Sequence, residues 1–358
     1  MPPSWIEANV PLAPLTSLEL GGPARFFADA RSEAQASEAL DFARQKGLST
    51  FVLGGGSNLV VGDAGFDGLV LRTSWRGLSF REQGAEVRLE CAAGEPWDEV
   101  VAASVRRGLS GLECLSGIPG LAGATPVQNV GAYGHEVADA LHSVRVLDCQ
   151  SREVRELHAA ACGFSYRHSR FKDAPDRALV LALTFVLRPG TPQIRYQELA
   201  RALAGVERPT PEQVRSTVLR LRGQKSMVVD ARDPNRRSAG SFFTNPVVSA
   251  GQAAQLVEQA MAQRLVAAPE EVPRYPLPDG RVKLAAAWLI ERAGIQRGWR
   301  TGNVGVSSRH ALALVHHGGG TTAELIRLAL HVRDTVARRF AVTLRPEPVF
   351  LGTRWPDG

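Results

Sequence analysis

The sequence predicts an α+β protein with two or three domains. Its 358 residues exceed the length of one ordinary domain. Short strand-like segments come mixed with amphipathic helices along the chain, which is typical of α+β folds. Apolar residues make up 44% and charged residues 22%, as in soluble globular proteins, so this composition excludes disorder, collagen-like repeats and coiled coils for the bulk of the chain.

The first half of the chain carries mostly strand signals. A helix is expected over residues 32–46, because Ala and Leu recur there at spacings of three and four and Gly47 can end it. Short apolar segments bounded by turn residues then predict strands. These strands are expected at residues 49–53, 59–61, 68–72 and 87–91, with a longer buried strand at 178–187.

Helix signals become stronger after residue 190. Thr210 is a capping residue followed by Pro211 and, three residues after the cap, by Gln213, so a helix is expected over about 211–224. The remaining predictions are helices at 284–292 and from Thr321, a loop at 229–237 and a final strand at 341–344.

The charge balance favours a small anionic ligand over nucleic acid. The net charge is +6, and almost all the basic residues are arginines, which pair well with carboxylates and phosphates. Because the basic residues are scattered and only 6% of residues are aromatic, an RNA- or DNA-binding surface is less well supported. The chain shows neither a long apolar run nor a secretory signal, so we expect a cytoplasmic protein without membrane contact.

Cysteine and histidine patterns predict no metal site. The cysteines show neither CxxC spacing nor histidine partners at zinc spacing, so reduced thiols are expected. They are Cys91, Cys114, Cys149 and Cys162. His316 and His317 are adjacent on an expected strand and would point to opposite faces, so we interpret them as structural.

A glycine-rich turn follows the strand at 49–53. Its Gly54-x-Gly56 start suggests a dinucleotide-binding loop, but Leu59 stands where a third small residue is needed, and a strand-like segment follows in place of a helix. Consecutive backbone N–H groups can still bind a pyrophosphate there, because glycine has no Cβ to obstruct the approach. A plain tight hairpin would give the same pattern.

A second glycine-rich segment, residues 116–134, is more informative. It has too many small residues for a packed core and too few solubilising residues for a linker. We interpret it as backbone that lies against a large flat ligand.

Six motifs, in this order, resemble those of the UDP-N-acetylenolpyruvoylglucosamine reductase family, flavoenzymes of peptidoglycan precursor synthesis. They are LGGGSN (53–58), SGIPGLAGATPVQNVGAYG (116–134), FSYRHSRFK (164–172), SAGSFFTNP (238–246), KLAAAWLIERAG (283–294) and LRPEPVFLG (344–352). The resemblance covers nearly the whole chain. It implies an α+β fold with a vanillyl-alcohol-oxidase-type, PCMH-like FAD-binding region in two subdomains and a C-terminal α+β substrate-binding domain. The expected parts are FAD subdomains at 1–72 and 73–208, a substrate-binding domain at 209–340, and a C-terminal segment, 341–358, that returns to the active site.

The resemblance also implies an activity and its cofactors. NADPH would reduce UDP-N-acetylglucosamine enolpyruvate to UDP-N-acetylmuramate through non-covalently bound FAD, with no nucleic acid or membrane as partner. One alternative is another FAD oxidoreductase of this fold that acts on a sugar or lactone. An alternative of another class is a nucleotide- or RNA-binding module, whose binding would depend steeply on salt.

Three residues match the family's catalytic positions. Arg167 would hold the enolpyruvyl carboxylate and offset the charge that develops during reduction. Ser241 would donate the proton; its hydroxyl is a very weak acid, which suits only a base as strong as a carbanion or enolate. Glu347 would act with Arg167 in stabilising the intermediate.

Further residues are expected to bind the cofactor and the substrate. The cofactor set implied by the resemblance is Gly54, Gly55, Gly56, Ser57, Asn58, Gly117, Ile118, Pro119, Gly123, Ala124, Gln128, Asn129 and Gly131. The expected substrate set is Tyr133, Tyr196, Arg222, Lys225 and Asn245. In this set Arg222 and Lys225 would meet the UDP pyrophosphate, and Tyr196 matches a tyrosine of family members that close a loop over substrate. One departure stands out, since His316 replaces the family's usual asparagine.

Overall fold

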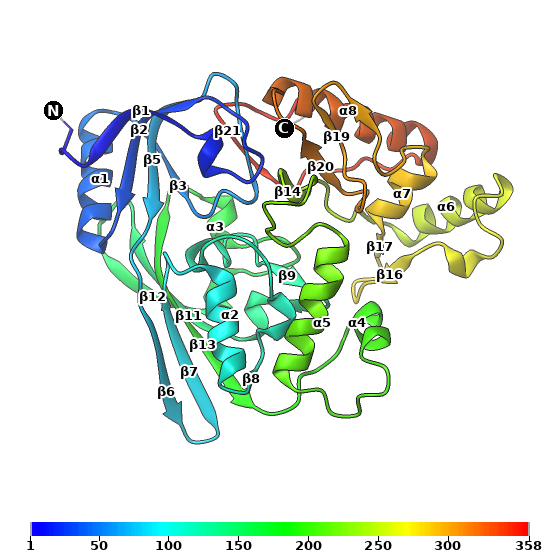
Figure 1. Ribbon diagram of the computed structural model, residues 1–358, viewed down its shortest axis with the longest axis horizontal. Coiled ribbons are helices and arrows are strands. Elements are labelled where there is room, and N and C mark those ends of the chain that lie inside the picture. Colours follow the sequence, from blue (N-terminus) through cyan, green and yellow to red (C-terminus); the bar gives the residue numbers. More distant parts are fainter. Residues whose placement is uncertain (1, 357–358) are drawn as a thin grey trace. The chain divides into compact units, whose positions relative to one another are not determined.

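The computed structural model describes residues 2–356, which form two compact units, each with its own hydrophobic core. Figure 1 shows the course of the chain. Of the described residues, unit 1 comprises 2–11, Pro23–Ser57 and Gly65–Val229, and unit 2 comprises Leu12–Gly22, Asn58–Ala64 and 230–356. The structure thus groups two short N-terminal segments with the C-terminal part of the chain, which the sequence did not predict.

The first sheet of unit 1 has the order β1-β2-β5-β3. Strand β1 is antiparallel to β2, whereas β5 runs parallel to both β2 and β3. Helix α1 lies against this sheet (Figure 1), and its N-terminus is capped by the Ser32 hydroxyl, which accepts the N–H of Gln35. The elements are β1 (Ile6–Pro11), β2 (Pro23–Ala30), α1 (Glu33–Gln45), β3 (Ser49–Leu53) and β5 (Phe66–Thr73). The predicted helix at 32–46 and strands at 49–53 and 68–72 are therefore confirmed.

The second sheet of unit 1 is antiparallel, with the order β12-β11-β13-β7-β6 and with β8 beside β13. Its central strand β13 (Ala178–Pro189) confirms the predicted buried strand and extends it by two residues. Leu183 and Phe185 of this strand are fully buried. The other strands are β6 (Leu78–Gln83), β7 (Glu86–Ala92), β8 (Leu109–Ser110), β11 (Leu141–Asp148) and β12 (Val154–His158).

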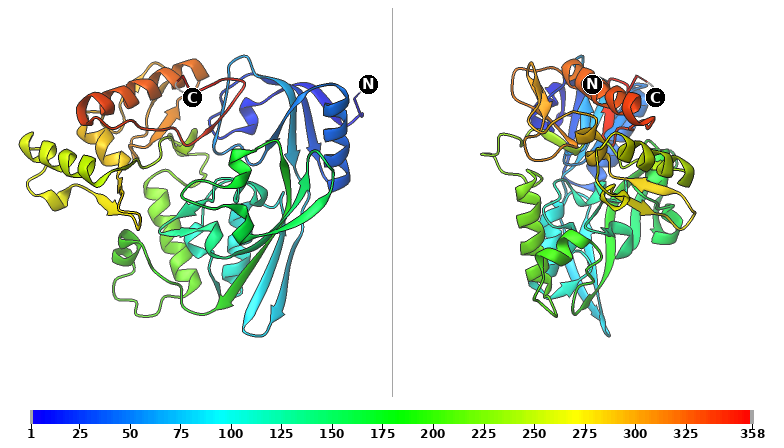
Figure 2. Two further views of the ribbon diagram at one scale, coloured as in Figure 1. Left: turned by 180° about the vertical axis from the view of Figure 1, so that it is seen from behind. Right: turned by 90° about the vertical axis from the view of Figure 1, so that its right-hand side faces the viewer.

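Helices α2 and α5 pack side by side along unit 1 (Figures 1 and 2). Helix α5 begins at the predicted cap: Thr210 accepts the N–H of Gln213, and the Gln213 side chain accepts the N–H of Thr210. The predicted helix at 211–224 is confirmed. The helices and short strands of this region are α2 (Trp97–Arg106), β9 (Gly131–Ala132), β10 (His135–Glu136), α3 (Arg170–Asp173), α4 (Gln197–Ala202) and α5 (Pro211–Gln224).

Unit 2 contains a four-stranded sheet of order β14-β20-β19-β18 and a three-stranded sheet of order β15-β17-β16. Helices α7 and α8 pack against each other in the core of this unit. The bounds are β14 (Ser238–Ser241), β15 (Val247–Val248), α6 (Ala250–Ala262), β16 (Arg274–Pro276), β17 (Val282–Leu284), α7 (Ala286–Arg292), β18 (Arg300–Thr301), β19 (Val304–Val306), β20 (Ala313–His316) and α8 (Thr322–Phe340). The helices predicted at 284–292 and from Thr321 are confirmed, the first of them beginning two residues later than expected.

The final strand of the chain was predicted at the wrong place. Residues 341–344 form no strand; Ala341 has a φ of 53° and ends α8 in the left-handed conformation. Val342 and Leu344 are both buried. The alternation of apolar and polar residues over 341–344 therefore reflects side-chain packing and not the pairing of a strand. The last strand is β21 (Val349–Leu351), which runs parallel to β4 (Leu59–Val61).

None of the helices within residues 2–356 is both long enough and apolar enough to cross a membrane.

Candidate active site

The two glycine-rich loops of unit 1 touch each other. A Cβ built on Gly55 would lie 2.4 Å from the Cα of Gly120, a distance that no side chain tolerates. The Ser57 hydroxyl donates to the carbonyl of Pro119 at 3.0 Å and ties the loops together. The first loop leads directly into β4 with no helix between them, which agrees with the prediction that it is not a Rossmann-type loop.

A cavity of about 100 Å³ borders both loops. Gly54 belongs to the first loop, Gly123 and Ala124 belong to the second, and the rings of Phe51 and Phe171 complete the lining. The N–H groups of Gly55 and Gly56 donate to no backbone carbonyl of residues 2–356. Backbone N–H groups of a glycine-rich loop can bind the pyrophosphate of a flavin nucleotide, and the neighbouring cavity of about 100 Å³ has room for only part of such a ligand.

Asp98 of α2 holds the second loop in place. Its Oδ1 accepts the N–H of Gly117 at 2.6 Å, and both its oxygens accept from the Arg215 guanidinium at 2.6 and 2.8 Å. Burial by itself would raise the pKa of this carboxyl, but the hydrogen bonds from Arg215 and Gly117 outweigh burial and lower the pKa. Sequence reasoning missed both Asp98 and Arg215, because neither lies in a motif.

Arg222 also supports this loop. Its side chain is buried, and Nη2 donates to the carbonyls of Gly117 and Met227 at 3.3 and 2.7 Å. Burial lowers the pKa of the guanidinium. Helical spacing predicted that Arg222 and Lys225 share one face suited to a pyrophosphate, whereas in the structure the Arg222 guanidinium turns inward to two backbone carbonyls.

Lys225 and the two expected substrate tyrosines lie in the same part of unit 1. The rings of Tyr133 and Tyr196 meet edge to face, with centroids 5.6 Å apart. Burial raises the pKa of the Tyr133 hydroxyl to about 12. Lys225 Nζ donates to Oε2 of Glu198 at 2.6 Å, and Glu198 follows Tyr196 closely at the start of α4. Lys225 is thereby joined to the segment that carries Tyr196.

Arg167 lies at a tight turn next to the second glycine-rich loop. Its φ is 55°, and its Nη2 donates to the carbonyl of Gly131 at 2.7 Å. Asn129 is fully buried, and its amide group bonds to Glu136, to the carbonyl of Ser165 and to the N–H of Ala138. The expected cofactor contact of Asn129 would therefore fall to its backbone.

Ser241 lies at a bulge in unit 2. The pairing of β14 with β20 shifts register between Ser238 and Ser241, and Gly240 has a φ of 73° there. The N–H of Phe242 donates to the carbonyl of Leu312 at 2.7 Å and anchors the chain directly after the serine.

A histidine that the sequence analysis did not single out accompanies this serine. The Ser241 hydroxyl oxygen lies 3.5 Å from Nε2 of His310. The resemblance named the serine by its motif, whereas His310 lies in the β19–β20 connection outside the quoted motifs.

Glu347 lies close to Ser241 in the chain's fold. Its N–H donates to the carbonyl of Phe242 at 2.8 Å, and its carbonyl accepts from the Asn58 amide at 3.4 Å. An isolated bridge between Phe243 and Pro346 continues the pairing. The structure therefore brings two of the three expected catalytic residues, Ser241 and Glu347, onto adjoining backbone segments of unit 2.

Two other predicted positions take part in the local structure of unit 2. The Asn245 side chain accepts the N–H of Ala286, the first residue of α7, at 2.9 Å. His316 is buried; Nδ1 lies 3.0 Å from the carbonyl of Leu18, and Nε2 accepts the N–H of Gly320 at 3.0 Å. Both ring nitrogens of His316 thus bond to backbone, as its structural interpretation predicts.

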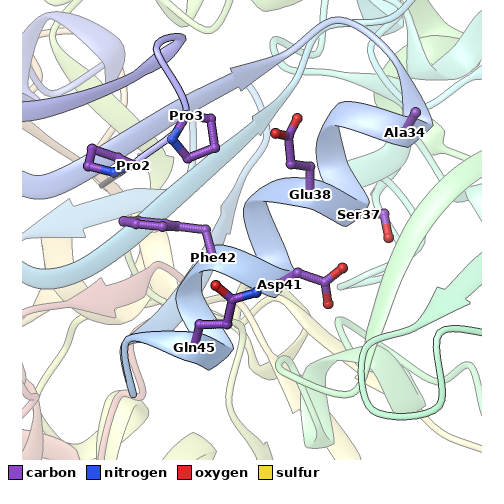
Figure 3. Close-up of a pocket in the computed structure, with 8 residues that line it drawn as sticks. All are labelled: Pro2, Pro3, Ala34, Ser37, Glu38, Asp41, Phe42 and Gln45. Atoms are coloured by element: carbon purple, nitrogen blue, oxygen red, sulfur yellow. The ribbon is translucent and has the colours of Figure 1, made fainter.

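A larger pocket of about 740 Å³ lies on unit 1 beside α1. Figure 3 shows its lining residues, which are Pro2, Pro3, Ala34, Ser37, Glu38, Asp41, Phe42 and Gln45. None of the expected catalytic, cofactor or substrate residues is among them, so size alone does not identify the site.

Nothing within residues 2–356 suggests a metal centre. No group of three or more His, Cys, Asp or Glu residues is placed to hold a metal ion in that range. The four cysteines are free thiols, and burial raises the pKa of Cys114 to about 12 and that of Cys162 to about 11.

Comparison with known proteins agrees with the motifs and the fold. Residues 24–156 match the FAD binding domain, and residues 233–351 match the C-terminal domain of UDP-N-acetylenolpyruvoylglucosamine reductase. The reductase of Saccharopolyspora erythraea is 49% identical over 95% of this chain and 94% of its own length. That of Nocardia farcinica is 50% identical over 98% of this chain and 90% of its own length.

A solved structure confirms the predicted α+β fold. The reductase of Thermus caldophilus superimposes with a TM-score of 0.64 at 24% identity, covering 97% of this chain and 98% of that one. The FAD-binding region and the C-terminal domain inferred from the six motifs are both matched. With near-half identity over almost its entire length, the chain belongs to the UDP-N-acetylenolpyruvoylglucosamine reductase family.

Proposed function

We propose that this protein reduces UDP-N-acetylglucosamine enolpyruvate to UDP-N-acetylmuramate, with NADPH as reductant and non-covalent FAD as cofactor. It would act in the cytoplasm, in the peptidoglycan precursor synthesis that supports cell shape and division. Family membership and the matched FAD binding domain support the proposal. The observation that carries it is the placement of a weakly acidic hydroxyl, Ser241, on a segment hydrogen-bonded to that of Glu347.

FAD, when bound, accepts a hydride from NADPH and passes it to the substrate. The residues that would hold it are those of the two glycine-rich loops. Gly55 and Gly56 offer backbone N–H groups to the pyrophosphate, while Asp98 and Arg222 keep the second loop in position through Gly117.

The substrate's double bond takes up one hydride and one proton. The hydride adds to the terminal carbon, and negative charge then develops on the carbon that bears the carboxylate and spreads into the carboxylate oxygens. Arg167 would bind this carboxylate, and its guanidinium would stabilise the added charge. Glu347 would act with Arg167 in stabilising the same intermediate.

Ser241 would then give its proton to the carbanionic carbon. The resulting alkoxide would be stabilised by a hydrogen bond from His310, whose Nε2 lies 3.5 Å from the serine oxygen. A proton taken up from solvent, the one that the overall reduction consumes, would restore the serine hydroxyl and leave the protein unchanged.

Substrate binding is assigned to the group around Tyr133 and Tyr196. Lys225 would pair with the diphosphate of the UDP moiety, and the two tyrosines would cover the substrate. Asn245 would contribute through the segment that follows Ser241, although its side-chain oxygen is engaged with α7.

An anaerobic absorbance experiment tests the two half-reactions separately. NADPH should bleach the flavin of the purified protein, and the enolpyruvyl nucleotide should restore its colour. Ser241→Ala should leave bleaching intact and slow the recovery of colour by about 100-fold or more. Ser238→Ala is the matched control, because it removes a hydroxyl from the same strand, and it should leave both phases at the wild-type rate.

The outcomes separate the alternatives. Equal slowing of both phases by Ser241→Ala contradicts its role as proton donor. A yellow protein that ignores the enolpyruvyl nucleotide would be an oxidoreductase for another sugar or lactone. A colourless preparation that FAD cannot reconstitute would overturn the proposal as a whole.

A further inference from the structure

The turn that carries Arg167 has an unfavourable backbone conformation. Ser165 and His168 form an antiparallel bridge, and each donates its N–H to the other's carbonyl at 3.1 Å. Arg167 is the third of the four residues of this turn. Its φ is 55°, in the left-handed region that residues other than glycine and asparagine rarely adopt. Such a conformation persists only where the surroundings hold it.

Lys172 holds the carbonyl of this strained residue. Its Nζ donates to the Arg167 carbonyl oxygen at 3.1 Å. Lys172 comes from α3, whose cap residue Ser169 accepts the N–H of Phe171 and donates to the carbonyl of Val127 at 2.5 Å. Because Val127 belongs to the second glycine-rich loop, Lys172 is anchored to that loop when it reaches back to Arg167.

The other side of the turn is tied to the same loop. The buried amide of Asn129 donates to the Ser165 carbonyl at 3.3 Å and to Oε2 of Glu136 at 2.6 Å. At the far end of the side chain, a Cβ on Gly131 would lie 2.9 Å from Nη1 of Arg167, so the guanidinium lies directly against this glycine. The turn and the guanidinium are thus both positioned against one loop.

The residue type at position 172 is unusual for this chain. Lysine occurs only four times among the 42 basic residues. A lysine ammonium is a compact donor that can serve a single carbonyl oxygen, whereas the planar fork of arginine suits paired acceptors. A single-carbonyl contact is what Lys172 makes here.

We infer that Lys172 is a positioning residue for Arg167: its ammonium holds the Arg167 carbonyl and so keeps the strained turn that aims the guanidinium. This inference rests on the proposed role of Arg167 at the substrate carboxylate. Without the ammonium, Arg167 can relax out of the left-handed region, and its guanidinium moves away from the place where charge develops. A misplacement of about 1 Å is enough to slow a reaction about 100-fold.

The test is rapid kinetics on the FAD-loaded protein with Lys172→Met, which keeps the chain length and removes the charge. We expect wild-type FAD content and wild-type reduction by NADPH. Reoxidation at saturating enolpyruvyl nucleotide should slow by about 10- to 100-fold, and the substrate concentration needed for half-saturation should rise by a smaller factor, because the UDP moiety still binds. Lys46→Met, at an exposed lysine of the same unit, is the matched control and should behave as wild type.

Two further variants separate this inference from the proposed function. Arg167→Met should slow reoxidation, and Arg167→Met combined with Lys172→Met should be no slower than Arg167→Met alone, because the lysine acts through the arginine. With Lys172→Ala, added ethylammonium should restore part of the rate.

Three other results would contradict the roles proposed for Lys172 and Arg167. Unchanged reoxidation in Lys172→Met, while Arg167→Met is slow, removes Lys172 from the mechanism and leaves the proposed function standing. Loss of FAD or equal slowing of both phases in Lys172→Met would show a merely structural lysine. Unchanged reoxidation in Arg167→Met would instead contradict the role proposed for the arginine.

Discussion

Gly55 and Gly120 come from two loops that are 65 positions apart in the chain, yet their backbones are in direct contact. A Cβ on Gly55 would meet the Cα, C and N atoms of Gly120 at 2.4, 3.1 and 3.3 Å, all of them backbone atoms that no rotamer change can remove. The contact explains the glycine at position 55, and Gly54 is crowded by the same loop, since its Cβ would lie 2.7 Å from that of Ala124.

Gly55→Ala should therefore force the loops apart. We expect the free energy of unfolding to fall by about 1–3 kcal/mol, as for other overpacked sites, together with a lower FAD content after purification. Urea unfolding and the ratio of flavin to protein absorbance measure the two effects. Gly251→Ala in α6 is the control: its Cβ would meet nothing closer than 4.0 Å, so stability should stay the same or rise slightly. A variant of Gly55 with normal flavin content would contradict the proposed cradle.

Asp98→Asn should lower stability at neutral pH. The folded-state pKa of Asp98 lies below its ordinary value of 3.8, so its charge stabilises the fold above that value, and this stabilisation is lost as the pH falls through the folded-state pKa. Since 37% of the Asp98 side chain is exposed, solvent screening reduces the loss to about 1–2 kcal/mol.

Urea unfolding at several pH values measures this effect. The difference between wild type and Asp98→Asn should be constant from about pH 7 to pH 5, should begin to shrink below about pH 4, and should vanish only below the folded-state pKa, where Asp98 is protonated in both the folded and the unfolded protein. Asp67→Asn is the control, because Asp67 is 84% exposed and pairs with Arg25 at the surface. A difference that grows toward low pH would contradict the sign of the pKa change.

Glu347→Gln should impair mainly the reaction with substrate. The amide keeps the size of the side chain but changes its charge and its hydrogen-bonding groups, so flavin reoxidation should slow by about tenfold or more while reduction by NADPH continues. Stopped-flow absorbance resolves the two phases. Glu258→Gln, at an exposed glutamate of α6, should change neither. An unaffected second phase would remove Glu347 from the mechanism.

Lys225→Ala should weaken binding of the UDP substrate without loss of FAD. The loss of one charge-assisted contact corresponds to about a tenfold increase in the dissociation constant, which calorimetry can measure on the oxidised enzyme. Glu198→Gln is the informative partner variant: it removes the charge that Lys225 faces at 2.6 Å and leaves the lysine for the substrate, so affinity should hold or rise. A Lys225→Ala protein that merely loses FAD would show that the assignment is wrong.

The sequence predicted those elements whose signals are local. The Thr210 cap with Gln213 located α5 to the residue, and the apolar run over 178–187 located β13 to within two residues. Helix α2 and strands such as β11 had no prediction, because neither a cap signal nor a bounded apolar run distinguished them. The error at 341–344 has a similar origin. An alternating pattern indicates burial, but a strand also needs a neighbouring strand, and the pairing near the end of the chain is between β21 and β4.

The site was predictable only where motifs covered it. Arg167, Ser241 and Glu347 stood in motifs, but Asp98, His310 and the inward turn of Arg222 depend on tertiary contacts with residues far along the chain. Arg222 shows most clearly what the sequence could not predict. Helical spacing placed it beside Lys225, whereas its guanidinium bonds to the carbonyls of Gly117 and Met227.

The grouping of two early segments with the C-terminal part of the chain constrains how the protein can fold during synthesis. The chain passes between the two units five times, so unit 2 is assembled from three separate stretches. Leu59 of β4 pairs with Val349, which the ribosome adds 290 residues later. Contacts of such long sequence separation close slowly, because a large loop must be ordered first. We therefore expect unit 1 to gain structure on the nascent chain and unit 2 to form only after release, and no contiguous fragment can be expressed as unit 2 alone.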